Sequence, residues 1–337
     1  MSEKQVQRAL VLSGGSIKGA FQAGALAHVL ESGFVPDAIY GTSVGSLNGG
    51  FLAERAGRAA PDQPLDWPKL GQELEAFWKQ EVQSPSRIAR ARSTPELIWA
   101  ILRNKFDGLT DTSPLKELVA RVYKTSNLHA SPVPFYACAV NLVSGDVVYP
   151  SNKDPQIIEY IIASTAIPFE MPVKWIGQSP FVDGGAREIA PLNRAIEDGA
   201  QEIVCIICQP KALGVINFDV GNLLEYASRL MDVITNELVN NDVERFEKVN
   251  AWLRQYDQVQ GQLQALGEDN QLNEAVIAQM GALPESLKGK WRPIDLVVIQ
   301  PENEIVLDLL HFAPQDIGQV IQLGRDTAER VYPPKNK

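Results

Sequence analysis

Twice within its first 56 residues, the chain passes from a short apolar run through a glycine-containing loop into a helical pattern. Residues 9–12 (Ala-Leu-Val-Leu) precede the loop of residues 13–19, and residues 38–40 precede Gly41-Thr42-Ser43-Val44-Gly45. Repeated strand–loop–helix order is typical of parallel sheets, because parallel neighbours need a crossover connection. The pattern predicts an α/β fold of three layers, with a mostly parallel central sheet and helices on both faces.

The second loop has the G-x-S-x-G spacing of a serine-nucleophile turn. Without a Cβ at Gly41 and Gly45, strand and helix can approach closely, and Ser43 can occupy a strained backbone conformation. A helix beginning near Val44 directs its unpaired amides toward the negative charge that develops when Ser43 attacks a carbonyl. We therefore expect Ser43 to be presented to substrate and not buried. A plain glycine turn before a helix is the alternative.

The first glycine loop predicts an anion cradle, because converging backbone amides and a helix N-terminus favour negative charge. A nucleotide P-loop requires Lys-Ser or Lys-Thr after Gly19, where this chain has Ala20-Phe21. A dinucleotide fingerprint requires glycine in place of Ser16. These mismatches disfavour both nucleotide classes. Two interpretations of the loop remain. It binds a developing oxyanion, or it is a tight strand–helix connection without a ligand.

A carboxylate stands at the end of a later apolar run, where Phe181-Val182 leads to Asp183-Gly184-Gly185. The carboxyl ends of parallel strands are where open α/β sheets place their sites, and both glycine loops follow such ends. An aspartate can serve as base toward a serine only where burial adjusts its pKa, and the apolar Phe181-Val182 approach supplies such surroundings. Alone, an Asp-Gly pair more often forms a turn.

Histidine offers few alternatives, because the chain contains only His28, His129 and His311. The order of triad residues in α/β-hydrolases puts histidine last, which leaves His311 by elimination. His311 lies in an apolar stretch, residues 306–314, and a core or capping role is favoured for it. So few histidines also disfavour a zinc site. We expect no metal and no cofactor.

Composition restricts the partners and the compartment. With 31 Lys and Arg against 41 Asp and Glu, the net charge of −10 argues against nucleic acid and against strong adhesion to anionic lipid, so that any membrane contact is expected to be local and apolar. The N-terminus lacks an apolar signal core, and no run of about 18 apolar residues occurs. The expected location is the cytoplasm, where peripheral contact with membranes is compatible with the sequence. Oligomeric state is not specified.

The three cysteines do not form a disulfide framework in a chain of this length. Core packing is favoured over metal or redox chemistry for Cys205 and Cys208, whose C-x-x-C spacing lies inside an apolar run predicted as a buried strand.

We predict one domain over residues 7–332. A helical insert at about residues 70–121 contains Trp78 and Trp99, with Trp67 just before it; a core role is favoured for these side chains over a lid or acyl-binding wall. A polar helical segment at about residues 221–266 is expected to shield the cleft or form a partner surface. Further predicted elements are a hairpin of residues 134–141 and 145–149, a helix from about 155, a polar connector at 267–271, a strand within 293–301 and a helix at 315–331.

Together these features resemble the patatin-like phospholipase family, in matching order over residues 10 to about 208. The resemblance rests on residues 14–19 (Gly-Gly-Ser-Ile-Lys-Gly), 41–45, 163–168 (Ala-Ser-Thr-Ala-Ile-Pro) and 183–185. It implies a dyad in which Ser43 is the nucleophile and Asp183 the general base. It further implies an oxyanion hole at Gly14, Gly15 and Ser16, with Lys18, Gly19, Gly41, Gly45, Gly184 and Gly185 as supporting motif residues.

The activity implied by the resemblance is lipid acyl hydrolysis of phospholipase A or lysophospholipase type, through an acyl-serine intermediate, on a lipid or fatty-acyl ester substrate. Two alternatives are an acyltransferase and a non-catalytic lipid-binding or interaction protein on the same scaffold. The chain departs from the family at Ser16, where a third glycine is usual. We expect an ordinary negative φ there, with the serine hydroxyl bonded to a neighbouring amide.

Overall fold

The computed structural model describes residues 6–60, 63–217, 219–265, 292–307 and 309–334. The chain divides into two compact units. Unit 1 contains residues up to 239 and from 296 onward, and unit 2 contains residues 240–295. The single domain expected over residues 7–332 stays a prediction. Both glycine loops, Asp183 and the elements around them belong to unit 1.

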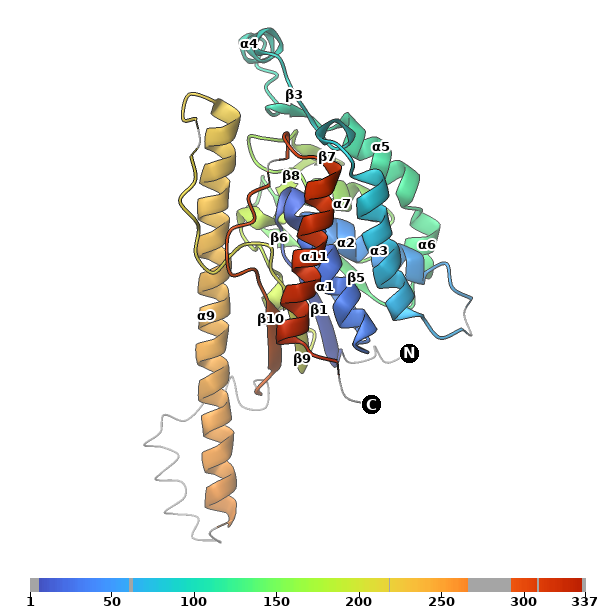
Figure 1. The fold of residues 1–337 in the computed structure, drawn as a ribbon, viewed down its shortest axis with the longest axis vertical. Coiled ribbons are helices and arrows are strands. Elements are labelled where there is room, and N and C mark those ends of the chain that lie inside the picture. Colours follow the sequence, from blue (N-terminus) through green and yellow to red (C-terminus); the bar gives the residue numbers. More distant parts are fainter. Residues whose placement is uncertain (1–5, 61–62, 218, 266–291, 308, 335–337) are drawn as a thin grey trace. The chain divides into compact units, whose positions relative to one another are not determined.

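The main sheet has the strand order β10-β9-β1-β2-β5-β8-β7, with β6 paired to β5 (Figure 1). Its centre is parallel, since β1 pairs in parallel with β2 and β9, and β2 with β5. The β6, β7 and β8 strands add antiparallel pairs at one side, among them the predicted hairpin. The strands are β1 Arg8–Leu12, β2 Ala38–Thr42, β5 Phe135–Asn141, β6 Val147–Val148, β7 Lys174–Ile176, β8 Ser179–Asp183, β9 Glu202–Ile206 and β10 Asp295–Ile299.

Helices follow the predicted pattern, and a small separate hairpin is formed by β3 (Arg90–Ala91) and β4 (Thr110–Asp111). The helical segment predicted at 221–266 is one continuous helix, α9, as far as residue 265; the connector predicted at 267–271 lies outside the described residues. The helices are α1 Gly19–Glu31, α2 Val44–Ala56, α3 Trp67–Glu81, α4 Thr94–Leu102, α5 Ser113–Val122, α6 Thr125–Ala130, α7 Ile157–Ser164, α8 Leu192–Glu197, α9 Leu223–Ala265 and α11 Pro314–Val331.

Neighbouring residues on β2 show that helices cover both faces of the sheet. Side chains alternate between faces along a strand. Ile39 packs against Gly49 of α2, whereas the hydroxyl of Tyr40 donates to Asp198, directly after α8, over 2.8 Å. These contacts confirm the three-layer α/β arrangement.

The core contains only part of the tryptophan cluster in the helical insert. Trp67 and Trp78 on α3 are buried in the main hydrophobic core, as predicted. Trp99 on α4 is 57% exposed, so the core role favoured for it was wrong. Among the described residues, no helix combines the length and the apolar character needed to cross a bilayer.

Candidate active site

Ser43 lies at the turn between β2 and α2, with φ 54° and ψ −124°, a region that non-glycine residues rarely adopt. A Cβ added to Gly41 would overlap the carbonyl of Gly45, and one added to Gly45 would overlap the carbonyl of Leu12 on β1. Both glycines therefore permit the close approach of strand and helix that the sequence predicts. The helix begins at Val44, also as predicted.

The side chain of Ser43 faces internal pockets and is shielded from bulk solvent. The residue is only 4% exposed, so the expectation that the turn would leave it unburied was wrong. It lines two adjoining pockets together with Ser16 and Ile167. Substrate must therefore enter a pocket to reach the hydroxyl.

Ser164, at the end of α7, fixes the strained turn. The amide of Ser43 donates to the Ser164 hydroxyl over 2.8 Å, and that hydroxyl donates to the carbonyl of Cys138 on β5 over 2.5 Å. The hydroxyl of Ser46 lies 2.8 Å from that of Ser164. Sequence reasoning marked residues 163–168 as a family motif but gave Ser164 no role. The structure makes it the residue that ties the turn to the sheet.

Asp183 is the last residue of β8, and its carboxylate contacts the glycine turn that comes directly after it. Its Oδ1 accepts a hydrogen bond from the amide of Gly185 over 2.7 Å, and its own amide donates to the carbonyl of Ala166 over 2.9 Å. Burial raises the pKa of Asp183 to about 7, against the opposing effects of hydrogen bonds from the side chain of Ser43 and the amide of Gly185.

The structure thus brings Ser43 and Asp183 to the same pocket, although they are 140 positions apart in the sequence, and the Ser43 side chain lowers the pKa of Asp183 as a hydrogen-bond donor does. A carboxyl group with a pKa near the working pH can both take up and return a proton. Asp183 is thus a candidate acceptor for the proton of the serine hydroxyl. Its catalytic roles stay a prediction.

The glycine loop after β1 offers fewer donors than expected. The amide of Gly14 donates to the carbonyl of Ile189 over 2.8 Å, so it is not directed at an oxyanion, and its expected role as a donor there was wrong. Within the part of the chain that the structure describes, no hydrogen bond uses the amides of Gly15 and Ser16. Both residues border the same pocket as Ser43 and Asp183. The candidate donors of the oxyanion hole are therefore the amides of Gly15 and Ser16.

The backbone of Ser16 is in the left-handed region, with φ 52°. The expected negative φ was therefore wrong. Gly15, the residue before it, has φ 158°. Ser16 is the first residue of a short 3-10 helix, Ser16–Lys18, which is followed directly by α1. Left-handed backbone is unfavourable for a residue with a Cβ, by about 1–2 kcal/mol.

This strain makes Ser16→Gly a stabilising substitution. Relief of about 1–2 kcal/mol exceeds the roughly 0.5–1 kcal/mol that the extra freedom of glycine in the unfolded chain costs, so the free energy of unfolding should rise by about 0.5–1 kcal/mol. Urea unfolding measures this. Ser16→Ala is the matched control, because it removes the hydroxyl but keeps the Cβ. Equal stability of the two variants would contradict the strain.

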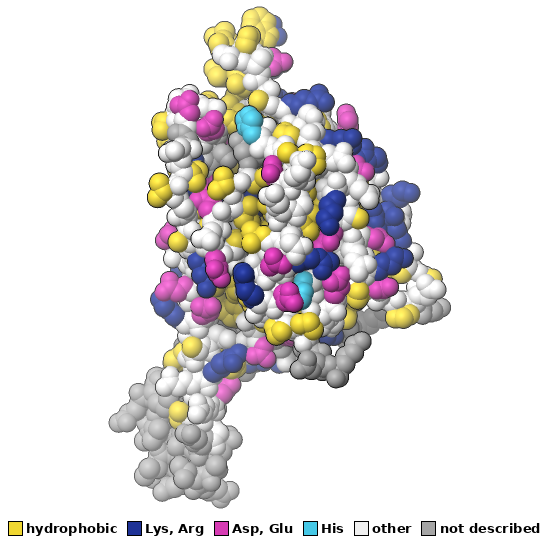
Figure 2. Space-filling model, viewed as in Figure 1, with side chains coloured by type: hydrophobic (Ala, Val, Ile, Leu, Met, Phe, Trp, Pro, Cys, Tyr) yellow, Lys and Arg dark blue, Asp and Glu magenta, His cyan; other side chains and the backbone are white. Residues whose placement is uncertain are grey.

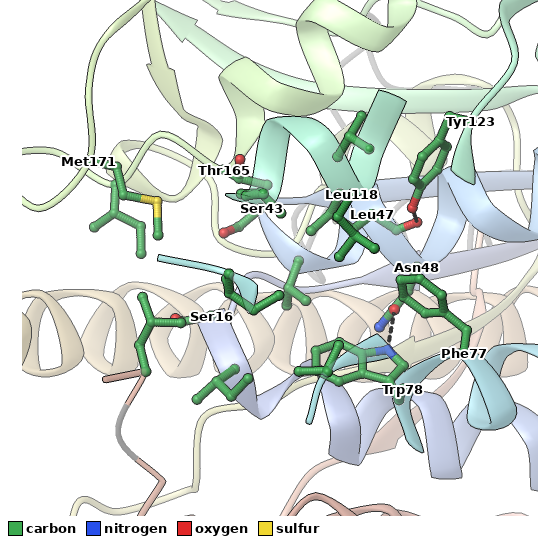
Figure 3. Close-up of a pocket in the computed structure, with 18 residues that line it drawn as sticks. Ser16, Ser43, Leu47, Asn48, Phe77, Trp78, Leu118, Tyr123, Thr165 and Met171 are labelled. Atoms are coloured by element: carbon green, nitrogen blue, oxygen red, sulfur yellow. Dashed lines mark hydrogen bonds between the residues drawn. The ribbon is translucent and has the colours of Figure 1, made fainter. Parts of the chain in front are cut away.

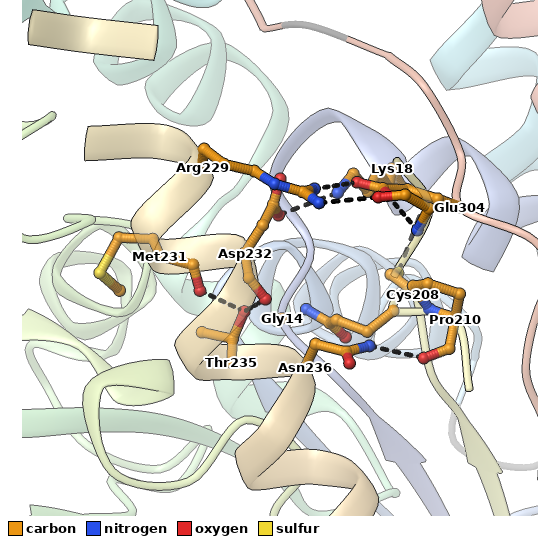
Figure 4. A network of polar contacts seen from close by, with 12 residues as sticks. Gly14, Lys18, Cys208, Pro210, Arg229, Met231, Asp232, Thr235, Asn236 and Glu304 are labelled. Carbon is orange, nitrogen blue, oxygen red and sulfur yellow. Dashed lines mark hydrogen bonds and ion pairs between the residues drawn. The ribbon is translucent and has the colours of Figure 1, made fainter. Parts of the chain in front are cut away.

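A polar network joins the glycine loop to the part of α9 that belongs to unit 1 (Figure 4). The ammonium of Lys18 pairs with Asp232 at 2.9 Å, Asn236 donates to the carbonyl of Pro210 over 2.6 Å, and Arg229 pairs with Glu304 at 2.6 Å. The motif lysine thus anchors a helix over the loop. No signal in the sequence singled out Asp232 among the many polar residues of this segment.

The two pockets that meet at Ser43 differ in character. One is apolar and holds about 620 Å³ of empty space, open solvent at its mouth included, within the usual range for ligand pockets. Leu47, Phe77, Trp78, Leu118, Tyr123 and Met171 are among its walls (Figure 3). The other, called the polar pocket below, is the more polar of the two, with Asp183, Gln209, Ser228, Asp232 and Thr235 among its lining residues.

The remaining candidates lie away from this site. His311 is exposed, which contradicts a core role, whereas the capping role favoured as the other possibility stays a prediction; His311 lines neither pocket. Burial raises the thiol pKa of all three cysteines, Cys138, Cys205 and Cys208, as expected for core packing. Within the described residues, no group of three or more His, Cys, Asp or Glu side chains is arranged to hold a metal ion.

Comparison with known proteins places the chain in a family. The uncharacterized protein YjjU of Escherichia coli (strain K12) is 26% identical over 210 residues, which cover 61% of this chain and 53% of YjjU, about half of that relative's length. Among solved structures, VipD from Legionella pneumophila is similar with a TM-score of 0.37 and 11% identity, over 97% of this chain and 67% of that chain. The family model described as patatin-like phospholipase matches residues 10–196, more than half of the chain. That match includes both glycine loops, Ser43 and Asp183, and the chain therefore belongs to the patatin-like phospholipase family.

Proposed function

We propose that the protein is a serine-dependent lipid acyl hydrolase of phospholipase A or lysophospholipase type, with Ser43 as nucleophile and Asp183 as general base. Family membership supports lipid acyl ester hydrolysis as the activity. The observation that carries the assignment of residues is that Ser43, on its strained turn, and the buried Asp183 line the same pocket, which meets an apolar pocket at Ser43.

Acylation begins with attack of the Ser43 hydroxyl oxygen on the ester carbonyl carbon, while its proton passes to the carboxylate of Asp183. The carbonyl oxygen becomes an oxyanion, which the amides of Gly15 and Ser16 stabilise together with the N-terminal end of α2. When the bond to the leaving alcohol breaks, Asp183 returns the proton to that alcohol. Ser43 then carries the acyl group.

Deacylation repeats these steps with water. Asp183 takes a proton from a water molecule, the resulting hydroxide attacks the acyl carbon, and the oxyanion forms again at the same amides. As the tetrahedral intermediate collapses, the proton passes from Asp183 to the Ser43 oxygen. A fatty acid leaves, and Ser43 and Asp183 return to their starting protonation states.

The two pockets fit the two halves of such a substrate. The acyl chain would occupy the apolar pocket, where burial of each methylene is worth about 0.8 kcal/mol. The leaving alcohol would lie on the polar side, beside Asp183, which has to protonate it. Ser43 borders both pockets, so an ester bound across them presents its carbonyl to the hydroxyl.

A covalent probe tests the proposal. A fluorophosphonate with a long alkyl chain should label the protein, and peptide mass mapping should find the label on Ser43. Ser43→Ala should abolish labelling, whereas Ser228→Ala, which removes another serine of the polar pocket, should keep it. Labelling of a different serine would contradict the assignment.

A further inference from the structure

The helix α4 and the turn after it expose a cluster of large apolar side chains. None of the residues of α4 is buried. Ile98, Trp99, Ile101, Leu102 and Phe106 are between 42% and 73% exposed. Residues 94–106, named here the apolar tip, stand at the end of the β3–β4 hairpin, away from the other helices of unit 1 (Figure 1). Hydrophobic atoms gather there in Figure 2.

The apolar tip is held in shape by local contacts and does not depend on a core. The amide and the hydroxyl of Ser93 both donate to the carboxylate of Glu96 over 2.8 Å, which caps the start of α4, and Pro95 occupies its first turn. At the other end, the guanidinium of Arg103 lies 4.0 Å from the ring centre of Trp99. Isolated helices of nine residues are marginal in water, so these contacts maintain an exposed apolar surface.

Charge around the apolar tip runs opposite to that of the whole chain. Residues 87–107 contain five basic side chains and two acidic ones, whereas the chain as a whole has a net charge of −10. Arg103 and Lys105 are both exposed, next to the apolar side chains. A positive rim around exposed tryptophan and aliphatic groups is complementary to a surface that is apolar beneath an anionic or zwitterionic layer.

The base of the hairpin is joined to the wall of the apolar pocket. The amide of Leu109 donates to the carbonyl of Phe169 over 3.0 Å, and the amide of Thr110 donates to that of Glu170 over 2.9 Å. Ile167 and Met171, on either side of this segment, line the pocket, and Phe169 itself is exposed. The hydroxyl of Thr110 also donates to the carbonyl of Glu170, over 2.7 Å. These three hydrogen bonds connect the hairpin that carries the apolar tip to the segment that lines the pocket with Ser43.

We propose that the apolar tip is a membrane-docking element, which inserts its apolar side chains into the interfacial layer of an anionic lipid bilayer. Trp99 and Leu102 would enter the acyl boundary while Arg103 and Lys105 remain at the phosphate level, as long basic side chains do at interfaces. Docking is independent of the hydrolytic chemistry and holds whether or not Ser43 is the nucleophile.

Vesicle binding of the full chain tests this proposal. All proteins carry Ser43→Ala, so lipid is not consumed, and vesicles consist either of phosphatidylcholine with phosphatidylglycerol or of phosphatidylcholine alone. We expect Trp99→Ser with Leu102→Ser to weaken co-sedimentation at least about tenfold. Each of the substitutions Arg103→Gln and Lys105→Gln should lower the affinity for anionic vesicles about fivefold. Trp252→Ser, at an exposed tryptophan of unit 2, is the matched control and should bind unchanged.

Depth of insertion gives a second readout. Lipids with brominated acyl chains should quench tryptophan fluorescence of the Ser43→Ala protein, and Trp99→Phe should remove that quenching while binding persists. With active Ser43, the Trp99→Ser and Leu102→Ser pair should hydrolyse a short-chain soluble ester at the unchanged rate. Equal binding by the tip variants and the control, or a dimer in solution that the tip variants dissociate, would overturn the proposal.

Discussion

Replacement of Ser43 by alanine is expected to lower kcat for ester hydrolysis by about 10⁴-fold or more, the scale on which loss of a serine nucleophile acts in other hydrolases. The substitution removes one oxygen atom and leaves the amide of residue 43 bonded to Ser164. The fold should therefore be retained. Hydrolysis of a nitrophenyl ester gives the rate, and circular dichroism with thermal unfolding gives the fold.

Ser228→Ala separates loss of the nucleophile from loss of any pocket hydroxyl. Ser228 lines the polar pocket beside Ser43 but has no role in the proposed acyl transfer, so its kcat should stay within the same order of magnitude. An unchanged rate in Ser43→Ala would exclude Ser43 as the nucleophile, whereas a lack of hydrolysis by wild type would favour the non-catalytic lipid-binding alternative. An equal loss in both variants would indicate a general disturbance of the pocket.

Glycines made much of the site predictable from the sequence. Gly41 and Gly45 are required where β2, α2 and β1 approach within contact of one another, and such constraints are local in sequence, so they leave a readable motif. Asp183 was recognisable from the motif in which a carboxylate and two glycines end an apolar strand, although that strand, β8, pairs antiparallel with β5 and so does not follow the rule for parallel strands. The α/β class followed from the same strand–loop–helix repetition.

The features that escaped prediction depend on distant parts of the chain. Whether Gly14 has a free amide is decided by the carbonyl of Ile189, and Asp232 matters because it meets Lys18. Neither pairing leaves a local pattern. The residue type of Trp99 favours a core position. Trp99 is nevertheless exposed, because no other part of the described residues packs over α4 and buries it.

Replacement of Asp183 by asparagine is expected to lower kcat by about 10²–10⁴-fold, because asparagine cannot accept the proton of Ser43. His311→Ala should retain most of the activity, since His311 lines neither pocket. In wild type, kcat/KM should rise with pH up to about 7, as Asp183 ionises. Imidazole titrates in a similar range, so the profile is also measured in His311→Ala, which should keep it. A larger loss of kcat in His311→Ala than in Asp183→Asn would indicate that His311 is the base.

The same substitution should stabilise the protein at neutral pH. Burial raises the pKa of Asp183 from 3.8 to about 7, so between these values the folded state binds more protons than the unfolded state, and the free energy of unfolding falls as pH rises. Asparagine has no charge to bury. At about pH 8, Asp183→Asn should therefore exceed wild type by a free energy on the order of 2–4 kcal/mol, and the difference should shrink toward about pH 4. Urea unfolding of both proteins across this range measures it. Because other groups titrate alike in both proteins, a difference that does not vary with pH would show that folding does not raise the pKa of Asp183, which would contradict its proposed role as a buried base.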